Sequence, residues 1–163
     1  MPGLRPGSAP GTDAEPALAR LLARGVRRAL GDLGFATVTE LVLASGRRVD
    51  VAGIDRRGEI VMVEIKTSLA DLRADRKWPE YRAFCDALLF AVPSDFPVQS
   101  LPSDAGLLVA DGFGAALLRE APRHPLPAAR RRAVTLRFAL TASLRLGRIE
   151  DPARNDLEPA LLS

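Results

Sequence analysis

The chain has little of the side-chain chemistry on which many enzymes depend. Its 163 residues contain a single cysteine, Cys85, and a single histidine, His124. One cysteine excludes an intrachain disulfide and fits a reducing compartment, and its apolar neighbours favour a buried thiol over a nucleophile. His124 lies in a proline-rich segment with no second histidine and no nearby serine or cysteine. The sequence therefore argues against a zinc site or a catalytic triad at this residue.

Long hydrophobic runs are also missing. No stretch approaches the roughly 18 apolar residues that a membrane span needs, and the N-terminus lacks the apolar core of a signal peptide. We therefore expect no membrane segment and a cytoplasmic location. A hydrophobic content of 47% is enough for one domain with a substantial core.

The two ends of the chain differ in composition from its middle. Residues 1–12 are rich in glycine, proline and serine, and we expect a disordered tail there. Residues 151–163 are polar, and we expect a flexible C-terminal tail. Residues 13–150 between them are predicted to form a single domain. The sequence gives no indication of the oligomeric state.

Lysine is scarce in a chain that is otherwise basic. Of 23 lysine and arginine residues, only Lys66 and Lys77 are lysine, and the formal net charge is +3. This balance permits a nucleic-acid partner without distinguishing DNA from RNA. Lys66 stands two residues after Glu64, where a compact and movable ammonium suits the position better than the planar fork of arginine.

The segment from residue 47 to residue 68 has the pattern of a β-hairpin. Two runs rich in valine, isoleucine and methionine flank the polar turn at residues 55–58. Successive side chains of a strand point to opposite faces, so Glu64 and Lys66 share one face. Antiparallel pairing returns the second strand to the Asp50 end of the first. We therefore expect Asp50, Glu64 and Lys66 to meet at one end of the sheet.

Two neighbouring carboxylates need a positive charge between them. At about 4 Å apart they repel by about 4 kcal/mol at an effective dielectric constant of about 20. Lys66 supplies one positive charge, and Mg²⁺ or Mn²⁺, which prefer hard oxygen ligands, would supply the rest. Such a metal lowers the pKa of a bound water, and the neighbouring ammonium stabilises charge on a phosphate. Together these groups are suited to phosphodiester cleavage.

Asp50 followed by Glu64-x-Lys66 resembles the PD-(D/E)XK signature of restriction-endonuclease-like nucleases. The runs VEIKTSLADLRADRKWPEYRAFCDALLFAVPSDFP and GLLVADGFGAALLREAP closely resemble the MmcB-type family of bacterial DNA repair proteins. This resemblance covers roughly Leu18 to Ala121. The proline of the signature is absent, since Val49 precedes Asp50, but that proline binds no metal in the family.

The resemblance implies a fold, a site and a function. The fold is α/β, a restriction-endonuclease-like mixed β-sheet flanked by helices. Asp50, Glu64 and the backbone carbonyl of Ile65 are then ligands of Mg²⁺ or Mn²⁺, and Lys66 is the catalytic lysine. The expected function is a metal-dependent DNA nuclease in DNA repair or the damage response. The alternative is a nonenzymatic DNA-binding component of a repair complex, and either function allows repair-protein partners.

The remaining pattern predicts helices and closely spaced strands. Leucine and valine recur at helical spacing after the N-terminal tail, and short apolar runs bounded by polar residues or proline are typical of buried strands. A helical crossover makes the strands that it joins parallel, so the sheet should be mixed. Besides the hairpin, the expected strands cover residues 35–44, 86–93, 105–110 and 115–120, and the expected helices cover residues 13–33, 69–78 with a continuation over 80–85, and 128–146.

Other residues have two interpretations each. Glu40 is either an edge residue that faces water or an additional carboxylate near the metal, as related nucleases often have. The arginines of the first helix form either a solvated face or phosphate contacts. The crossover and the last helix either pack on the sheet, with tryptophan and tyrosine as anchors, or contact DNA. The candidates for DNA contact are Arg73, Arg76, Lys77, Trp78, Tyr81, Arg130 and Arg131.

Overall fold

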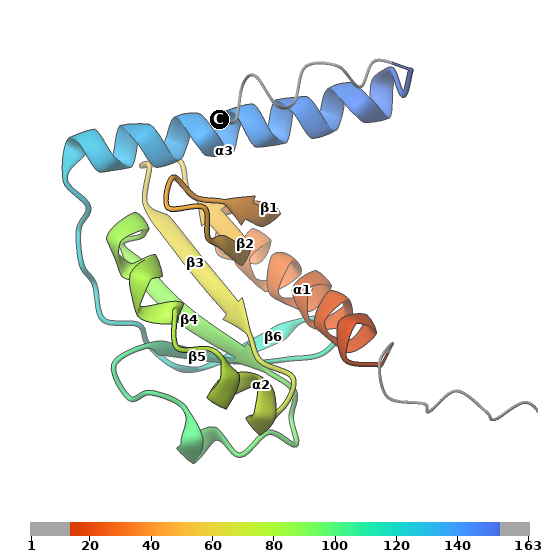
Figure 1. Cartoon of the computed structure of the whole chain (residues 1–163), viewed down its shortest axis with the longest axis vertical. Coiled ribbons are helices and arrows are strands. Elements are labelled where there is room, and N and C mark those ends of the chain that lie inside the picture. Colours follow the sequence, from red (N-terminus) through yellow and green to blue (C-terminus); the bar gives the residue numbers. More distant parts are fainter. Residues whose placement is uncertain (1–13, 154–163) are drawn as a thin grey trace, which may run out of the picture.

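The structure, a computed structural model, describes residues 14–153. Its three α-helices, two 3₁₀ helices and six strands follow one another with short connections (Figure 1). The helices are α1 (Ala14–Asp32), α2 (Leu69–Ala74), η1 (Trp78–Phe84), η2 (Val98–Ser100) and α3 (Ala128–Glu150), and the strands are β1 (Ala36–Val42), β2 (Arg48–Ile54), β3 (Ile60–Ile65), β4 (Ala87–Val92), β5 (Gly106–Ala110) and β6 (Ala115–Arg119).

The six strands form one mixed sheet in the order β1-β2-β3-β4-β5-β6. The first three strands are antiparallel neighbours, β3, β4 and β5 run parallel, and β6 returns antiparallel to β5. The predicted fold class, an α/β mixed sheet flanked by helices, is therefore confirmed. The hairpin predicted at residues 47–68 is the β2–β3 pair, in which Val51 lies opposite Val63.

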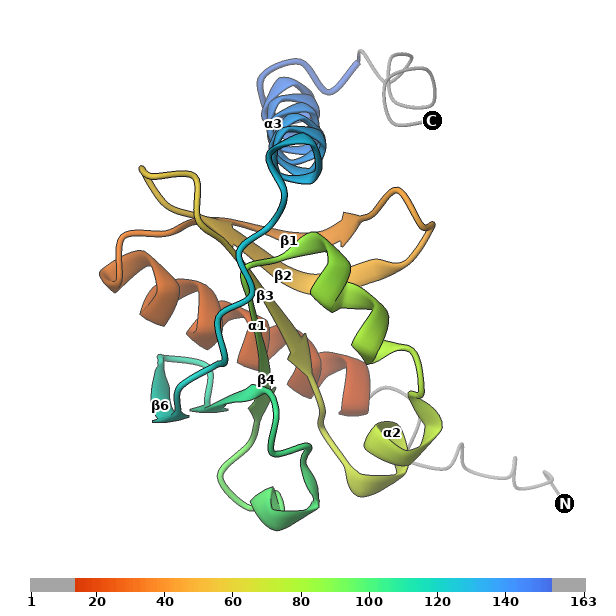
Figure 2. The ribbon, with the colours of Figure 1, turned by 90° about the vertical axis from the view of Figure 1, so that its left-hand side faces the viewer.

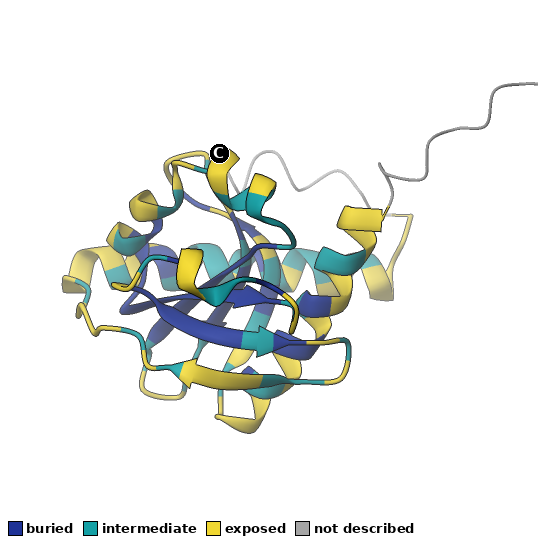
Figure 3. Cartoon of the chain, turned by 90° about the horizontal axis from the view of Figure 1, so that it is seen from below, coloured by how far each residue is buried: buried dark blue, intermediate teal, exposed yellow. Residues whose placement is uncertain are grey.

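Helices cover both faces of the sheet (Figures 1 and 2). On one face, Leu22, Val26 and Leu30 of α1 pack against valines and alanines of the central strands. On the other face, η1 and α3 residues from Val134 to Ala142 pack against Met62 and its neighbours. Every residue of β3 and β4 is buried as a result, which explains their continuous apolar sequences (Figure 3). Glu64, near the end of β3, is also buried but is the one charged residue among the apolar residues of these two strands.

The sequence predicts the limits of most elements to within a few residues. The first helix ends at Asp32, and Gly34 adopts the positive φ of 89° that ends many helices. Cys85 is buried, as its apolar neighbours predict. The last helix continues four residues past the predicted limit, to Glu150. The predicted tail at residues 1–12, and residues 154–163 of the predicted C-terminal tail, lie outside the described residues.

One prediction in the crossover is wrong. The sequence predicts a helix over residues 69–78, but α2 ends at Ala74 and the chain resumes as a 3₁₀ helix at Trp78. The break lies at Asp75, whose backbone is extended. One carboxylate oxygen of Asp75 accepts the backbone N–H of Lys77, and the other reaches Lys66. Those two contacts replace the hydrogen bonds of a continued helix.

Candidate active site

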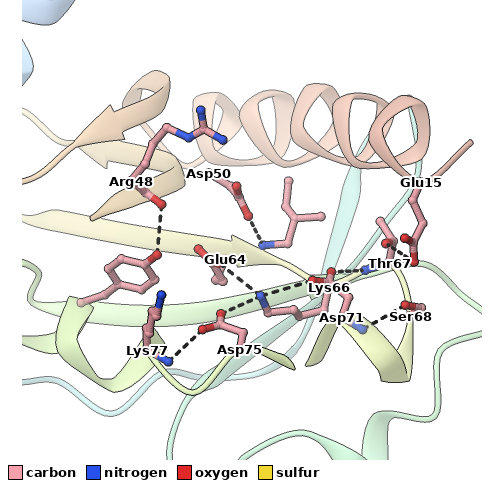
Figure 4. Close-up of polar contacts among 12 residues, drawn as sticks. Glu15, Arg48, Asp50, Glu64, Lys66, Thr67, Ser68, Asp71, Asp75 and Lys77 are labelled. Atoms are coloured by element: carbon pink, nitrogen blue, oxygen red, sulfur yellow. Dashed lines mark hydrogen bonds and ion pairs between the residues drawn. The ribbon is translucent and has the colours of Figure 1, made fainter. Parts of the chain in front are cut away.

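Lys66 lies at the centre of a cluster of acidic side chains just past the end of β3 (Figure 4). It is only 3% exposed, and its Nζ donates hydrogen bonds to Asp75 at 2.7 Å and to Glu64 at 3.2 Å. Asp71 of α2 stands 3.9 Å away. Burial opposes the charge of Lys66, but the hydrogen bond to Asp75 and the charges of Glu64 and Asp71 outweigh it and raise the lysine pKa. The ammonium is therefore protonated in the folded protein.

Glu64 has one satisfied oxygen and one unsatisfied oxygen. Its Oε1 accepts the hydrogen bond from Lys66, whereas its buried Oε2 has no hydrogen-bond partner among the described residues. Burial, followed by the charge of Asp50, raises the pKa of Glu64 to about 8, and the nearby Lys66 offsets only part of this rise. A buried carboxylate oxygen without a donor is costly and marks a place where a cation is favoured.

Asp50 lies on β2 across from the end of β3. The backbone pairing of the two strands ends at Val51 and Val63. Beyond that point, the Asp50 carboxylate accepts a hydrogen bond from the backbone N–H of Ile65 at 2.7 Å. Burial raises the Asp50 pKa, and the Ile65 hydrogen bond and the charge of Lys66 oppose that rise. The structure thus brings Asp50 and Glu64 close enough for the charge of Asp50 to raise the pKa of Glu64.

Glu40 interrupts the pairing of β1 with β2. Thr39 pairs with Val51 and Leu41 with Val49, but Glu40 between them adopts a left-handed backbone with φ of 50°. Its exposed carboxylate lies 3.6 Å from the guanidinium of Arg48. Non-glycine residues adopt this conformation at a cost of about 1–3 kcal/mol, and such residues cluster at functional sites. Glu40 therefore stands at the edge of the site, and its role as an additional acidic residue stays a prediction.

A groove of about 660 Å³ opens beside Asp50, between α1 and the ends of β1 and β2. Asp50 and Ile65 line it, but Glu64 and Lys66 do not. Sequence reasoning missed two residues here. Nothing in the sequence pattern indicates that Asp75 is a partner of Lys66. The pattern also does not indicate that Arg48, which directly precedes Val49 and Asp50, lies beside the site. The arginines that line the groove are Arg20, Arg24, Arg27 and Arg48.

The residues at the end of β3 fit a divalent metal ion. Residues 14–153 contain no group of three histidine, cysteine, aspartate or glutamate side chains arranged to hold one. Asp50 and Glu64 would instead supply two carboxylates, and Mg²⁺ is commonly bound by one or two carboxylates with water in the remaining positions. The unsatisfied Oε2 of Glu64 and the raised pKa values of both acids are the features that a bound cation would relieve. The Ile65 carbonyl as a further ligand stays a prediction.

Comparison with known proteins places the chain in a family. The model of the MmcB-like family, described as DNA repair protein MmcB-like, matches residues 8–153. The chain belongs to the MmcB-like family. No curated protein matches this MmcB-like chain.

Two solved structures resemble this MmcB-like protein. One is a protein of unknown function from Silicibacter pomeroyi, with 43% identity, a TM-score of 0.82, and coverage of 86% of this chain and 96% of that chain. The other is a repair endonuclease from Pyrococcus abyssi, with 21% identity, a TM-score of 0.33, and coverage of 54% and 40%. The Silicibacter pomeroyi protein shares the fold of this chain over nearly the whole of its own length.

Several of the candidates for DNA contact pack inside this MmcB-like protein. Tyr81 is buried and its hydroxyl donates to the Arg48 carbonyl, so its ring is closed to a DNA base. The Trp78 ring meets Phe90 edge-on at 5.2 Å, and Arg82 stacks over it at 5.1 Å. These contacts fit the interpretation of both aromatic residues as anchors of the crossover.

The basic candidates divide into two groups. Arg131 donates to both carboxylate oxygens of Asp86 at 2.7 Å, and Arg130 donates to the Ala83 carbonyl. Both arginines therefore fasten α3 to the rest of the fold. Arg73, Arg76 and Lys77, around Asp75, have exposed side chains, and their contact with DNA stays a prediction.

Within residues 14–153, no helix is long and apolar enough to span a bilayer.

Proposed function

We propose that this MmcB-like protein is a metal-dependent DNA nuclease that acts in DNA repair. The observation that carries the proposal is the buried, unsatisfied Oε2 of Glu64 beside Asp50, with Lys66 hydrogen-bonded to the same glutamate. Packing alone does not account for this arrangement, because an acid without a donor costs free energy in the interior. Membership of a DNA repair family supports DNA as the substrate.

Each side chain has a defined part in this proposal. Asp50 and Glu64 would hold Mg²⁺ or Mn²⁺, which supplies a Lewis acid and a water of lowered pKa when bound. Glu64 would hold the metal as a carboxylate, because metal ligands must be deprotonated. Lys66 keeps its proton, orients water, and stabilises the negative charge that develops on the phosphate. The backbone N–H of Ile65 donates a hydrogen bond to the Asp50 carboxylate and fixes its orientation.

A second candidate function is a nonenzymatic DNA-binding component of a repair complex. The burial of Lys66 favours it, because three carboxylates already surround the ammonium and only 3% of the residue is exposed. In that case the acidic cluster serves stability or recognition, and DNA is bound without cleavage.

A nuclease assay separates the two functions. We expect the protein to cleave at least one of single-stranded, nicked, flapped or abasic DNA in Mn²⁺ or Mg²⁺. Lys66→Ala should lower the rate by roughly 10²–10³-fold, the usual effect of losing one group that stabilises transition-state charge. Arg132→Ala, an exposed cation on α3, is the matched control and should cleave at the wild-type rate.

The outcomes of this assay are distinct. Equal cleavage by the wild type and Lys66→Ala would point to a contaminant or to a different site. No cleavage by a wild-type protein that still binds DNA would replace the nuclease with the nonenzymatic function. Circular dichroism of each variant shows whether a loss of activity reflects unfolding.

A further inference from the structure

The groove beside Asp50 has a distinctive wall. Along α1, its lining consists of arginine, alanine and proline, and the carboxylates that line it, those of Glu40 and Asp50, come from β1 and β2. Arg20, Arg24 and Arg27 follow the i, i+4, i+7 spacing that places side chains on one stripe of a helix. Ala19 and Ala23 leave space between the arginines because their side chains are short. A solvated helix face normally mixes charges of both signs, so this wall needs another explanation.

The arginines of the groove differ in how firmly they are held. Arg24 donates to the Gly112 carbonyl at 2.7 Å, and Arg27 donates to the Thr37 hydroxyl at 3.2 Å. Arg24 also stacks over the Phe113 ring at 5.7 Å. Each hydrogen bond uses one N–H of a guanidinium that has five, so both arginines retain further donors. Arg20 is exposed and has no side-chain partner within residues 14–153.

Arg48 completes the groove from the opposite side. It comes from β2, two residues before Asp50, and its side chain is 60% exposed. Its contact with Glu40 is long, at 3.6 Å, and an exposed ion pair of this kind contributes little to stability. Figure 4 shows the Arg48 side chain above Asp50, turned away from Lys66. A negatively charged ligand can therefore take over this guanidinium at small cost.

The groove matches one strand of a nucleic acid in length and chemistry. Seven residues of helix separate Arg20 from Arg27, which is about 10 Å along the axis. One strand of a duplex rises by about 3.4 Å per phosphate along the duplex axis, so a stripe of this length parallel to that axis spans about three phosphates. Alanine side chains between arginines suit the apolar faces of sugars between phosphates.

We propose that this groove binds the sugar-phosphate backbone of one DNA strand and leads it to Asp50. Arg20 and Arg48 bind phosphates directly, and the tethered Arg24 and Arg27 fix the path between them. The inference rests on the proposed function, since the strand bound in the groove would be the strand on which the site at Asp50 acts. It also places the DNA contacts on α1 and β2 rather than on α3.

Binding measurements without cleavage test the groove. Fluorescence anisotropy in EDTA, with single-stranded and duplex DNA of the same sequence, gives Kd over a series of salt concentrations. For Arg20→Gln/Arg48→Gln we expect a Kd increase on the order of tenfold, and a salt slope lower by about 1.4 on single strands or about 1.8 on duplex, the values for two lost phosphate contacts. The same measurement on RNA of this sequence tests whether the groove selects DNA.

A matched variant removes the same charge elsewhere. Arg56→Gln/Arg132→Gln changes two exposed arginines, one on the β2–β3 turn and one on α3, that do not line the groove. We expect its Kd and salt slope to stay close to those of the wild type. Equal losses in the two double variants would overturn the inference, because the effect would then be one of net charge alone.

The groove and the nuclease fail in different ways. If the wild type cleaves DNA and the groove variant binds and cleaves normally, the inference is wrong and the proposed function stands. If the groove variant loses binding but no condition gives cleavage, the groove is a DNA site and the nuclease proposal is wrong.

Discussion

Glu64 is a buried acid at the end of a strand that is otherwise apolar. Apolar side chains of β3 pack against both helical layers, and Glu64 takes a position in that run with one oxygen unsatisfied. A protein selected only for stability gains from replacing such a group with an apolar residue. A bound cation, as in the proposed function, would offset this cost, and for that reason we propose a functional role for Glu64.

The raised pKa of Glu64 predicts how stability depends on pH. Because the pKa is about 8 in the folded protein and lies near 4.5 in the unfolded chain, the folded state binds the proton more tightly. In EDTA, we therefore expect the free energy of unfolding to be highest below about pH 4.5, as far as this group is concerned, and to fall as the pH rises to about 8. Glu64→Gln should remove most of this fall.

Urea unfolding at several pH values between about 5 and about 8 measures the effect. Glu120→Gln, at an exposed position after β6, is the matched control and should follow the wild type. Parallel pH profiles for the wild type and Glu64→Gln would show that Glu64 is ionised in the folded protein at neutral pH.

The sequence predicts the centre of the site because its residues are linked by local geometry. Asp50, Glu64 and Lys66 belong to one hairpin, and the alternation of strand side chains is enough to bring them together. The contact of Lys66 with Asp75 depends on a helix that stops early, and the ion pair of Arg48 with Glu40 lies where Glu40 interrupts the β1–β2 pairing. Neither feature has a local signal in the sequence.

At the scale of elements, α1 depends on one close approach to the sheet. A Cβ atom on Gly25 would lie 2.0 Å from the Asp111 carbonyl oxygen and 2.5 Å from that of Gly114. Both are backbone atoms of the β5–β6 turn, so no side chain can move aside. Gly25 therefore fixes how closely α1, and with it the wall of arginines, lies against the fold.

Two glycine substitutions in α1 should have opposite effects. Gly25→Ala forces α1 away from the β5–β6 turn and should lower the free energy of unfolding by about 2 kcal/mol or more, as overpacking against fixed backbone does. Gly31→Ala meets nothing within 4 Å and should raise it by roughly 0.5–1 kcal/mol, because alanine is the better helix former. Thermal and urea unfolding measure both changes. A stabilising Gly25→Ala would mean that α1 packs less closely than the structure shows.

Elements are predictable from sequence where packing and local pattern agree. The apolar runs of β4 and β5 have no competing interpretation, because strands buried on both faces are apolar throughout. The 69–78 segment differs, since its residues favour a helix while Asp75 makes tertiary contacts with Lys66. There the tertiary contact overrides helix propensity, and a single sequence does not reveal it.

At the scale of the whole molecule, Asp86 joins parts of the chain that are distant in sequence. Its carboxylate accepts the backbone N–H of Ile60 at the start of β3 and of Leu126 in the segment before α3, and it pairs with Arg131. The side chain is buried, and these hydrogen bonds hold the pKa of Asp86 below its usual value despite the opposing effect of burial. The long α3 is thereby positioned on the β1–β3 side of the sheet (Figure 1).

Asp86→Asn should therefore destabilise the whole fold. The amide keeps the shape of the side chain but leaves the half-buried Arg131 guanidinium without its counter-charge, so we expect a loss of about 2–3 kcal/mol. Because the Asp86 pKa is lowered by folding, its contribution is present above the usual aspartate pKa and is lost as the pH falls through the lower, folded value. Urea unfolding at neutral and acidic pH measures both effects.

Asp104→Asn is the control for this prediction, since the structure offers a second aspartate-arginine pair at the same distance. Asp104 and Arg82 also approach to 2.7 Å, but the Asp104 side chain is 59% exposed. Exposed pairs contribute about 1 kcal/mol or less, so Asp104→Asn should lower stability by much less than Asp86→Asn. Equal losses would mean that the distance between the charges, rather than the buried connections of Asp86, determines their contribution, and α3 would then be held by its apolar contacts alone.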